Sequence, residues 1–347
     1  MSEILNDRNR HTKLQIALLV LLTVSAALIT LSIEPSFTLG VSLALGLSFV
    51  GLGTGLIAGR RIRVPDLVIP LTVASCFSTL ALWSPLGKSA YGAIRHVDIG
   101  VSIEPAGLWI ISCHLAATAY FTGKTHGIWL AANLAGAIGS ALLMPELSLI
   151  PQIVVGTVII AWLQGQKRVA LIVISIVVMA VAASAAFPYV QQRWIGFLDP
   201  VGHALSAGYD YQAITRAVTE SQWFGRSASN LPAMSSPTDD YWLAAGCFQV
   251  GRLGMILWVM LFIGTLIFAL RIRQGSEEKG LLLRATCATL ILSLLVHAGY
   301  NLGFIPVTAT YPPLAGLSGS ISASQLFLLG YCVMDNAESE KKHSDSA

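Results

Sequence analysis

The sequence predicts an all-α polytopic membrane protein, and its composition is the first reason. Hydrophobic residues make up 54% of the 347 residues, charged residues make up 11%, and the mean hydropathy is +0.70. A soluble domain has about 25% charged residues, so this composition excludes a disordered chain, a coiled coil and almost any soluble enzyme. The net charge of +3, with Lys and Arg scattered along the chain, excludes a nucleic-acid partner.

Ten apolar stretches are the second reason, because a membrane helix needs about 20 mostly apolar residues. The predicted spans are Leu14–Ile33, Phe37–Ala58, Leu67–Pro85, Ile103–Phe121, Gly127–Met144, Leu149–Leu163, Val169–Phe187, Trp242–Leu270, Leu281–Gly303 and Pro313–Val333. A polar segment, residues 1–13, precedes the first span, so we expect no signal-peptide cleavage. We expect residues 14–334 to form one ten-helix domain and the polar tail, 335–347, to be disordered.

The positions of the charges predict the orientation in the membrane. With the N-terminus placed in the cytoplasm, 15 of the 21 Lys and Arg flank the inner ends of the spans and five flank the outer ends, while Arg252 falls within a span. Positive charge favours the cytoplasmic side, so we expect both termini to be cytoplasmic. Half of the 18 carboxylates then lie at or near the outer face, most of them in a long extracytoplasmic loop, residues 188–240, between spans 7 and 8.

The long loop is rich in aromatic residues, which are Trp194, Phe197, Tyr209, Tyr211, Trp223 and Phe224. This content argues against disorder and predicts a loop that packs at the membrane interface, where Trp and Tyr are enriched. The five cysteines lie in apolar runs and lack the spacing of a zinc site, so we expect neither a disulfide framework nor a metal–thiolate site.

Two adjacent carboxylates, Asp239 and Asp240, end the long loop directly before a long apolar stretch. Acidic residues complement the positive end of a helix dipole, and Asp239 can act as an N-cap, so a capped helix start is one interpretation. The other interpretation is a general base or a cation ligand that faces the outer leaflet. Two carboxylates exceed what capping needs, and both interpretations stay open at this point.

Three further segments carry polar residues at the ends of spans. In residues 92–100, Arg95 can bind an anionic group such as a diphosphate, or it can pair with a neighbouring Asp. The dipeptide Pro145-Glu146 forms a turn between two spans. Residues 300–320 combine prolines, glycines and small hydroxyl residues, which fits either a plain outer loop or a re-entrant segment that lines a cavity.

Taken in order, these segments resemble the SEDS family, the membrane glycosyltransferases typified by FtsW, RodA and SpoVE. The family's G-A-x-R-W-I and Q-P-S-E patterns match Gly92, Ala93, Arg95, Glu104 and Pro105, and its Q-P-D-x-G-T has a faint counterpart in Pro145-Glu146. Its F-L-D-P reads Phe197-Leu198-Asp199-Pro200, and Gly208, Tyr211, Gln212 and Trp223-Phe224-Gly225 follow. Its T-D-F and its late Pro-, Gly- and Ser-rich stretch match Thr238-Asp239-Asp240, Pro306, Pro313, Gly319 and Ser320.

The sequence departs from the family pattern at several polar positions. The family's Glu and Lys after Q-P-S fall on Gly107 and Ile110, and its E-E-L-G falls on Phe248-Gln249-Val250-Gly251. The chain therefore resembles a divergent member of the family. The register downstream of the long loop places the family's catalytic Asp on Asp240, with Asp239 as the reserve candidate.

The resemblance implies a peptidoglycan glycosyltransferase that polymerises lipid II at the outer face of the bacterial cytoplasmic membrane, in cell division or in the maintenance of cell shape. It implies that Asp240 is the general base. The residues it implies for binding the substrate and its diphosphate, with or without a Mg or Mn ion, are Arg95, Arg193, Arg216, Glu104, Tyr211 and Gln212. The motif residues that shape the cavity are Phe197, Asp199, Pro200, Pro306, Pro313, Gly319 and Ser320. The implied protein partner is a class B penicillin-binding protein, a transpeptidase with a single span.

Three other functions stay open on the sequence. A polymerase or ligase for another lipid-linked glycan would have a similar loop, and changed cavity residues would suit a changed substrate. A flippase for lipid-linked precursors would need charged groups near the middle of the bilayer, and the spans carry almost none. A catalytically weak scaffold of a cell-wall complex fits the missing polar residues, whereas the intact pair of Asp239 and Asp240 argues against it.

Overall fold

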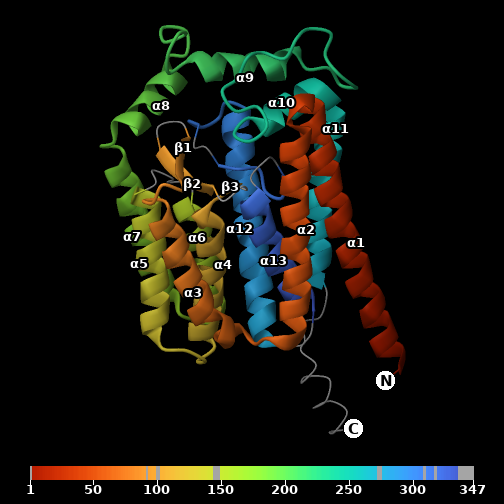
Figure 1. Ribbon diagram of the computed structural model, residues 1–347, viewed down its shortest axis with the longest axis vertical. Coiled ribbons are helices and arrows are strands. Elements are labelled where there is room, and N and C mark those ends of the chain that lie inside the picture. The colour runs from red at the N-terminus through yellow and green to blue at the C-terminus, as the bar shows by residue number, and fades with distance from the viewer. Residues whose placement is uncertain are drawn as a thin grey trace.

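The computed structural model describes residues 2–90, 93–98, 102–143, 149–271, 276–307, 310–315 and 319–334. The elements in these ranges are α1 (Ser2–Ile33), η1 (Pro35–Phe37), α2 (Thr38–Arg61), α3 (Val64–Ala81), β1 (Gly87–Ala90), β2 (Ala93–Asp98), β3 (Ser102–Ile103), α4 (Pro105–Phe121), α5 (Gly127–Leu143), α6 (Leu149–Leu163), α7 (Lys167–Ser184), α8 (Pro188–Leu198), α9 (Tyr209–Glu220), α10 (Trp242–Val250), α11 (Arg252–Arg271), α12 (Glu277–Asn301) and α13 (Gly319–Val333). The long helices stand side by side, and α8 and α9 lie across one end of them (Figure 1).

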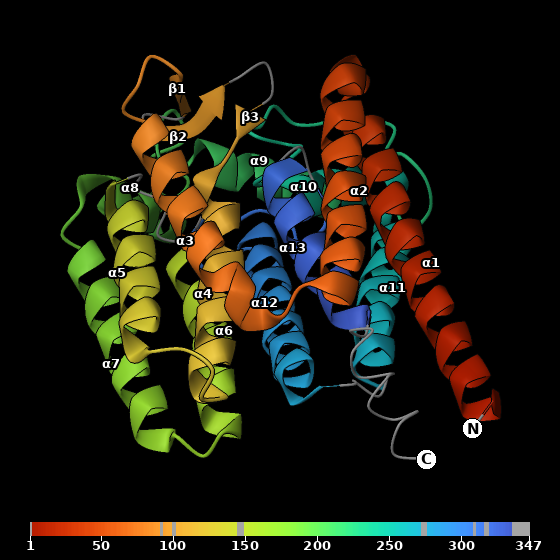
Figure 2. The ribbon, with the colours of Figure 1, turned by 60° about the horizontal axis from the view of Figure 1, so that its bottom comes forward.

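Each predicted span coincides with one helix or, in one case, with two helices. Five helices, α1, α2, α3, α11 and α12, are long and apolar enough to cross a membrane, and α5, α6 and α13 are shorter apolar helices. This confirms a helical, polytopic membrane protein, while the count of ten crossings stays a prediction. The chain begins and α13 ends at the same end of the bundle, opposite α8 and α9 (Figures 1 and 2), as an even number of crossings requires.

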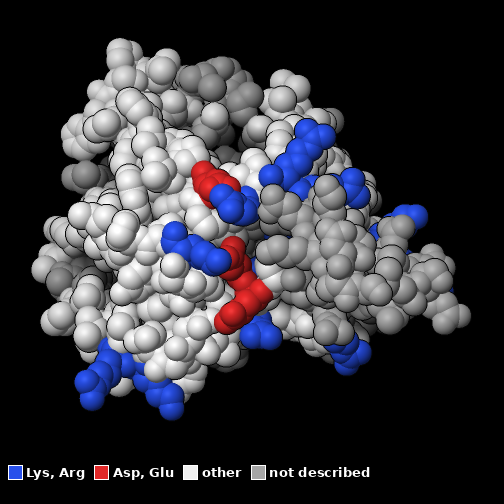
Figure 3. All heavy atoms as spheres, turned by 90° about the horizontal axis from the view of Figure 1, so that it is seen from below, with Lys and Arg blue, Asp and Glu red and all other residues white. Residues whose placement is uncertain are grey.

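Basic side chains gather at the end of the bundle that is predicted to face the cytoplasm. Figure 3 looks at this end and shows Lys and Arg around a small group of Asp and Glu. Exposed residues of this set include Arg60, Arg61, Lys124 and Arg271, which follow or end helices there. The distribution agrees with the predicted orientation, because basic residues are enriched at cytoplasmic span ends.

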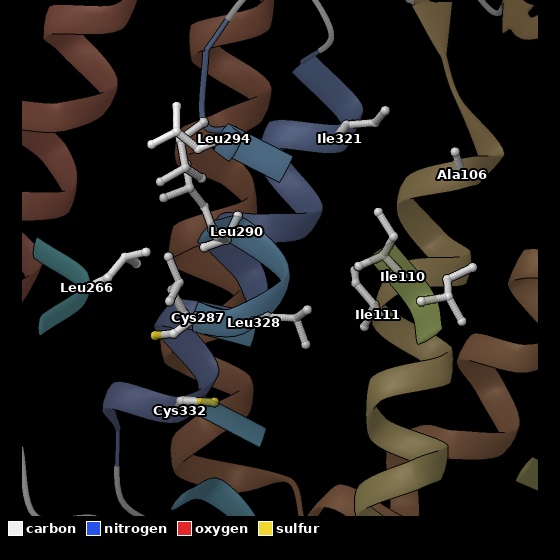
Figure 4. Packing of buried hydrophobic residues seen from close by; sticks show 14 of the residues in the cluster. Ala106, Ile110, Ile111, Leu266, Cys287, Leu290, Leu294, Ile321, Leu328 and Cys332 are labelled. Carbon is white, nitrogen blue, oxygen red and sulfur yellow. The ribbon is translucent and has the colours of Figure 1, made fainter. Parts of the chain in front are cut away.

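Glycines on α2 allow its close contact with α13. Gly51, Gly55 and Gly59 stand one turn apart, and a Cβ atom on any of them would lie within 2.4 Å of a carbonyl oxygen of α13. Small residues at such spacing let membrane helices approach closely and gain dispersion energy. The same core continues into α12 and α4: Leu290 of α12 packs alongside α13, and Leu328 of α13 points towards α4 (Figure 4).

A small antiparallel sheet, ordered β1-β2-β3, connects α3 to α4. The sequence predicted only a polar loop for this segment, because its strands are short and carry no clear alternation of apolar and polar residues. Strand β3 ends at Ile103, and the next residue, Glu104, stands directly before α4. The sheet therefore sets where this predicted site residue enters the bundle.

The prediction of one continuous helix over Trp242–Leu270 is wrong, because the helix breaks at Gly251. This residue has φ +87°, a backbone conformation that favours glycine, and it separates α10 from α11. A Cβ atom at Gly251 would lie 2.9 Å from both the backbone nitrogen of Gly225 and the carbonyl oxygen of Trp223. The backbone of the long loop therefore packs directly against Gly251. The hydropathy of the helix alone does not predict this contact.

Arg252, the basic residue that falls within a predicted span, holds the long loop to this break. Its Nη2 donates to the carbonyl oxygens of Val218 (3.0 Å) and Thr219 (3.2 Å) near the end of α9, and its Nε donates to the Ser221 hydroxyl (2.9 Å). The last carbonyls of a helix have no partner within the helix, so Arg252 satisfies them. The guanidinium also lies 5.7 Å from the centre of the Trp223 ring.

Substitution of Gly251 by Ala should destabilise the protein. The added Cβ meets backbone atoms in a left-handed conformation, and such strain costs about 1–3 kcal/mol of the free energy of unfolding. Gly264→Ala on α11 is the matched control, because nothing lies within 4 Å of its added Cβ and Ala is favoured over Gly within a helix by about 0.5–1 kcal/mol. Unfolding in detergent measures both variants, and equal stability of the two would contradict the account of the break.

Candidate functional site

The sequence motif that begins with Phe197 joins the two helices of the long loop. The Phe197 ring packs on the Tyr211 ring with their centres 5.9 Å apart, and the Gln212 side chain donates to the Pro200 carbonyl oxygen (2.6 Å). The Asp199 carboxylate accepts a backbone N–H three residues further on (2.8 Å), which stabilises the turn after α8. In this structure the motif holds α8 against α9, and Gln212 makes its contact within that joint.

Tyr211 connects this pair of helices to the segment that follows α12. Its hydroxyl donates to the carbonyl oxygen of Arg193 on α8 (3.2 Å) and accepts the backbone N–H of Val307 (2.6 Å). Burial raises the pKa of Tyr211 above its ordinary value, and the nearby Arg193 partly opposes this shift. The Tyr211 hydroxyl is therefore neutral at physiological pH, and the Arg193 charge lies close to it.

Asp210 fastens the last part of the long loop. Its carboxylate accepts the backbone N–H of Ser235 (3.0 Å), the Ser235 hydroxyl (2.8 Å) and the Tyr241 hydroxyl (3.2 Å). Burial raises the pKa of Tyr241, and the carboxylates of Asp210 and Asp240 raise it further. These contacts place the chain around residue 240 against α9.

Asp240 lies half-buried at the start of α10, among charged and phenolic groups from several elements. Its backbone carbonyl accepts the side chain of Asn301, the residue after Tyr300 at the end of α12 (3.0 Å), and the hydroxyl of its neighbour Tyr241 donates to Asp210 of α9 (3.2 Å). We call Arg193, Asp210, Asp240, Tyr241 and Tyr300 the outer carboxylate site. It joins α8, α9 and α12 at the end of the bundle that is predicted to be extracytoplasmic (Figure 1).

The structure corrects one interpretation of the adjacent carboxylates. The helix α10 begins at Trp242 and its N-cap is Tyr241, so Asp239 does not occupy the N-cap position. The carbonyl oxygen of Asp239 accepts the N–H of Trp242 (3.3 Å), while the Trp242 side chain donates to Thr30 of α1 (2.9 Å). The interpretation of Asp239 as the N-cap is therefore wrong, and a functional role of the two carboxylates stays a prediction.

A second group of predicted residues meets where α4 and α13 begin. The backbone N–H of Glu104 donates to the Ser320 hydroxyl (3.0 Å), and its buried carboxylate accepts the Tyr311 hydroxyl (2.7 Å). The N–H of Leu314 donates to the side chain of Gln325 on α13 (2.9 Å). Most residues from 310 to 315, Pro313 among them, are buried, so this segment packs inside the protein rather than forming an exposed loop.

The departures from the family pattern lie in close helix contacts. A Cβ atom at Gly107 would lie 2.5 Å from the Ser324 hydroxyl and 3.0 Å from the Ser320 carbonyl oxygen, and Ile110 on the same helix is buried. A Glu side chain has no room at residue 107 while α4 and α13 are this close. Gly319 is equally tight, because its Cβ would lie 2.7 Å from the Cα of Ala44 on α2.

Other predicted residues stand elsewhere. Arg216 is exposed on α9 and pairs with Glu220 (2.6 Å), one turn away, and their hydrogen bond lowers the pKa of Glu220. Within the described part of the chain, Arg216 makes no contact with the outer carboxylate site. Arg95 lies on β2, but its side chain is outside the described set, as is the whole of Pro145-Glu146. Pro306 is half-buried just before Val307.

Several residues of the site were not predicted from the sequence. Asp210 lies between Gly208 and Gln212, which match the family pattern, so its place among matched residues could have identified it. Tyr300 and Asn301 begin the Pro- and Gly-rich stretch, but nothing in the sequence pairs them with residue 240. For the described residues, no three His, Cys, Asp or Glu side chains group closely enough to hold a metal ion.

Comparisons with known proteins point to one family. The family model for FtsW, RodA and SpoVE, described as "Cell cycle protein", matches residues 12–343. Among curated relatives, "Probable peptidoglycan glycosyltransferase FtsW" of Pseudoalteromonas translucida is 26% identical over 194 residues, which cover 52% of this chain and 48% of that protein. The relative of the same name in Synechocystis is 26% identical over 274 residues, which cover 74% of this chain and 69% of that protein. The chain thus spans about half to two thirds of the length of these relatives.

Solved structures share the fold. One is a chain from a structure described as "Structural coordination of polymerization and crosslinking by a peptidoglycan synthase complex", with a TM-score of 0.70 and 21% identity, covering 92% of this chain and 96% of that chain. Another is the rod shape determining protein RodA of Thermus thermophilus, with a TM-score of 0.65 and 19% identity, covering 92% and 94%. At these identities the likeness establishes the arrangement of the helices.

The anchoring role of Asp210 can be tested by amide hydrogen exchange. Asp210→Ala removes three hydrogen bonds to the end of the long loop, and a bond to a charged group contributes about 1.5–3 kcal/mol. Exchange of the Ser235 amide should therefore become at least about tenfold faster. Arg216→Ala, which breaks the exposed pair on the same helix and leaves the bond of Glu220 to Ser229 of the loop in place, is the control and should leave that amide unchanged. Equal exchange in both variants would rule out the anchor.

Proposed function

Because the chain belongs to the FtsW, RodA and SpoVE family of multi-pass membrane proteins, we propose that it is a peptidoglycan glycosyltransferase that polymerises lipid II. The relatives described above carry the name of such an enzyme. The predicted orientation puts the outer carboxylate site at the extracytoplasmic face of the bacterial cytoplasmic membrane, where lipid II would meet it.

The half-buried carboxylate of Asp240 is the observation that carries this proposal. A general base needs a carboxylate that substrate can reach and that the protein holds in a fixed place. Asp240 meets both needs, since it is partly exposed and its backbone is hydrogen-bonded on both sides, through Ser236 and Asn301. In the proposed step Asp240 accepts the proton of the acceptor sugar's 4-hydroxyl as that oxygen attacks the anomeric carbon of the lipid-linked donor.

The leaving group of the proposed reaction is a diphosphate that carries negative charge. The bond between the anomeric carbon and the diphosphate oxygen breaks as the new glycosidic bond forms, and undecaprenyl diphosphate departs as an anion. Fixed positive charge near the leaving oxygen stabilises such a transition state. Arg193 lies on α8, where its carbonyl oxygen accepts the hydroxyl of the buried Tyr211 (3.2 Å), so we assign it this role. Arg95, much earlier in the chain on β2, stays the second candidate, and Glu104 and Tyr211 are proposed to contact the substrate.

No step of the proposed reaction uses a divalent cation. The carboxylates of the described residues do not form a group of three donors that could hold Mg or Mn. Asp210 accepts bonds from Ser235 and Tyr241, so it acts in this structure as an anchor of the loop. The proposed step uses the charge of Arg193 at the leaving group, and a Mg or Mn ion stays a prediction from the sequence.

A transpeptidase of the class B penicillin-binding type is the proposed partner. Polymerised glycan strands need crosslinking, and one solved structure that shares this fold comes from a complex that coordinates polymerization and crosslinking. The long loop exposes Trp194, Leu198 and Phe224 at the outer end of the bundle, and apolar surface of this kind suits a partner or the membrane interface.

A second candidate function is the polymerisation of another lipid-linked glycan. The observation that favours it is the tight packing at Gly107 and Ile110, where the family places Glu and Lys. A substrate groove without these charges would suit a different sugar or a different substituent. Folded protein that turns over a different undecaprenyl-linked glycan but not lipid II would establish this alternative.

Substitution of Asp240 by Asn should abolish polymerisation. A general base contributes about 10²–10⁴-fold to the rate, and Asn keeps the size of the side chain while it removes the proton acceptor. The measurement is the formation of glycan ladders from labelled lipid II by purified protein, alone and with a cognate transpeptidase. Binding of lipid II should stay close to that of the unmodified protein.

Asp239→Asn is the matched control, because the two carboxylates are neighbours and both are half-buried. We expect it to keep polymerising activity. If Asp240→Asn forms ladders at the rate of the unmodified protein, the assignment of the base is wrong. If only Asp239→Asn loses activity, the reserve residue is the base.

A further inference from the structure

Asn301, the last residue of α12, is completely buried next to the outer carboxylate site. Its Nδ2 donates to the carbonyl oxygen of Asp240 (3.0 Å) and to that of His297 (2.9 Å), and its Oδ1 accepts the backbone N–H of Ala244 (3.0 Å). An amide side chain has two donor hydrogens and one acceptor oxygen. Both hydrogens and the oxygen are therefore in use, which fixes the amide in one orientation.

The Asn301 amide stands between two backbone groups that a helix would join directly. Asp240 and Ala244 are four residues apart, so in a continuous helix the Ala244 N–H would donate to the Asp240 carbonyl. Here each of these groups bonds the Asn301 side chain instead. The backbone bond from the Ala245 N–H to the Tyr241 carbonyl (2.9 Å) is formed, so α10 starts just after Asp240.

Asn301 also replaces a local cap. The first N–H groups of a helix need partners from outside it, and the N-cap residue of α10, Tyr241, offers no side-chain bond. The partner for Ala244 comes from α12, where Asn301 is itself tied to the His297 carbonyl one turn earlier. The backbone of Asp240 is thus located relative to α12 and not only by the loop before it.

We propose that Asn301 is a positioning residue for Asp240, whose amide keeps Asp240 outside α10 and so aims its carboxylate at the acceptor sugar. This inference rests on the proposed function, because it concerns the same proton transfer. Without the amide, the Ala244 N–H can bond the Asp240 carbonyl directly, which draws Asp240 into the helix and moves its carboxylate.

The first test compares Asn301→Ala with a matched control in the full-length protein. We expect kcat for lipid II polymerisation to fall about 10²-fold, which is the usual cost of a misplaced catalytic group, while KM stays near its original value. Asn133→Ala is the control: Asn133 is also buried, and its Nδ2 bridges Thr72 of α3 and the Trp129 carbonyl of α5 (both 2.8 Å). It should lower stability without changing kcat of the folded protein.

The second test uses Asn301→Asp and the pH dependence of kcat. This variant keeps an oxygen for the Ala244 N–H, loses both donors and places a negative charge beside Asp240. Like charges raise the pKa of a carboxyl group, so the acid limb of the profile should move to higher pH. The other charged or phenolic groups near Asp240, which are Arg193, Asp210, Asp239, Tyr241 and Tyr300, are the same in every variant. The positioning role is tested by kcat on the plateau above this limb, which should fall because the bond to the Asp240 carbonyl is lost, whereas a merely structural role would reduce the yield of folded protein and leave the plateau in place.

The outcomes separate this inference from the proposed function. Unchanged kcat in folded Asn301→Ala, or an unchanged plateau of kcat in folded Asn301→Asp, overturns the positioning role while Asp240→Asn stays inactive. If Asn301→Ala does not fold, Asn301→Asp decides alone. Absence of polymerisation by the unmodified protein, with the transpeptidase present, instead overturns the proposed function itself.

Discussion

The need to satisfy backbone groups where a helix stops inside an apolar protein governs the outer end of this molecule. Unpaired N–H and C=O groups are costly when water cannot reach them. At the break at Gly251, Arg252 bonds carbonyls near the end of α9, and at the other end of α10, Asn301 accepts the N–H of Ala244. The short helix α10 is bonded at both ends by other parts of the chain: Asn301 accepts the Ala244 N–H near its start, and the Ser227 N–H of the long loop donates to its Phe248 carbonyl (3.0 Å). Asp240 stands at one of these ends, so its position follows from the way α10 is satisfied.

The segment between α12 and α13 links the two groups of predicted residues. Its Val307 N–H bonds the Tyr211 hydroxyl of the long loop, and its Tyr311 hydroxyl bonds the carboxylate of Glu104. The close glycine contact between α2 and α13 places the start of α13, and with it Ser320, beside Glu104. A substrate that touches the outer carboxylate site therefore lies near a surface built by α4, α12, α13 and the long loop.

How far the sequence could predict this arrangement depends on the range of each interaction. Apolar length is a property of each segment, so hydropathy located the helices of the bundle well. The break at Gly251 depends on contact with residues 223–225. The hydropathy of residues 242–270 carries no information about that contact. Of the residues predicted for substrate binding, Arg193 and Tyr211 are joined by a hydrogen bond, while Arg216 pairs with Glu220 on its own helix. Asn301 escaped prediction because its importance arises only when the end of α12 meets the start of α10.

A structure of the protein with a lipid II analogue that cannot react tests the central claim most directly. The account predicts that the 4-hydroxyl of the acceptor sugar lies about 3 Å from the Asp240 carboxylate, within reach for proton transfer, with the donor diphosphate next to Arg193. A ligand bound at another face of the bundle, or an acceptor hydroxyl directed away from Asp240, would contradict both the assignment of the base and the proposed function.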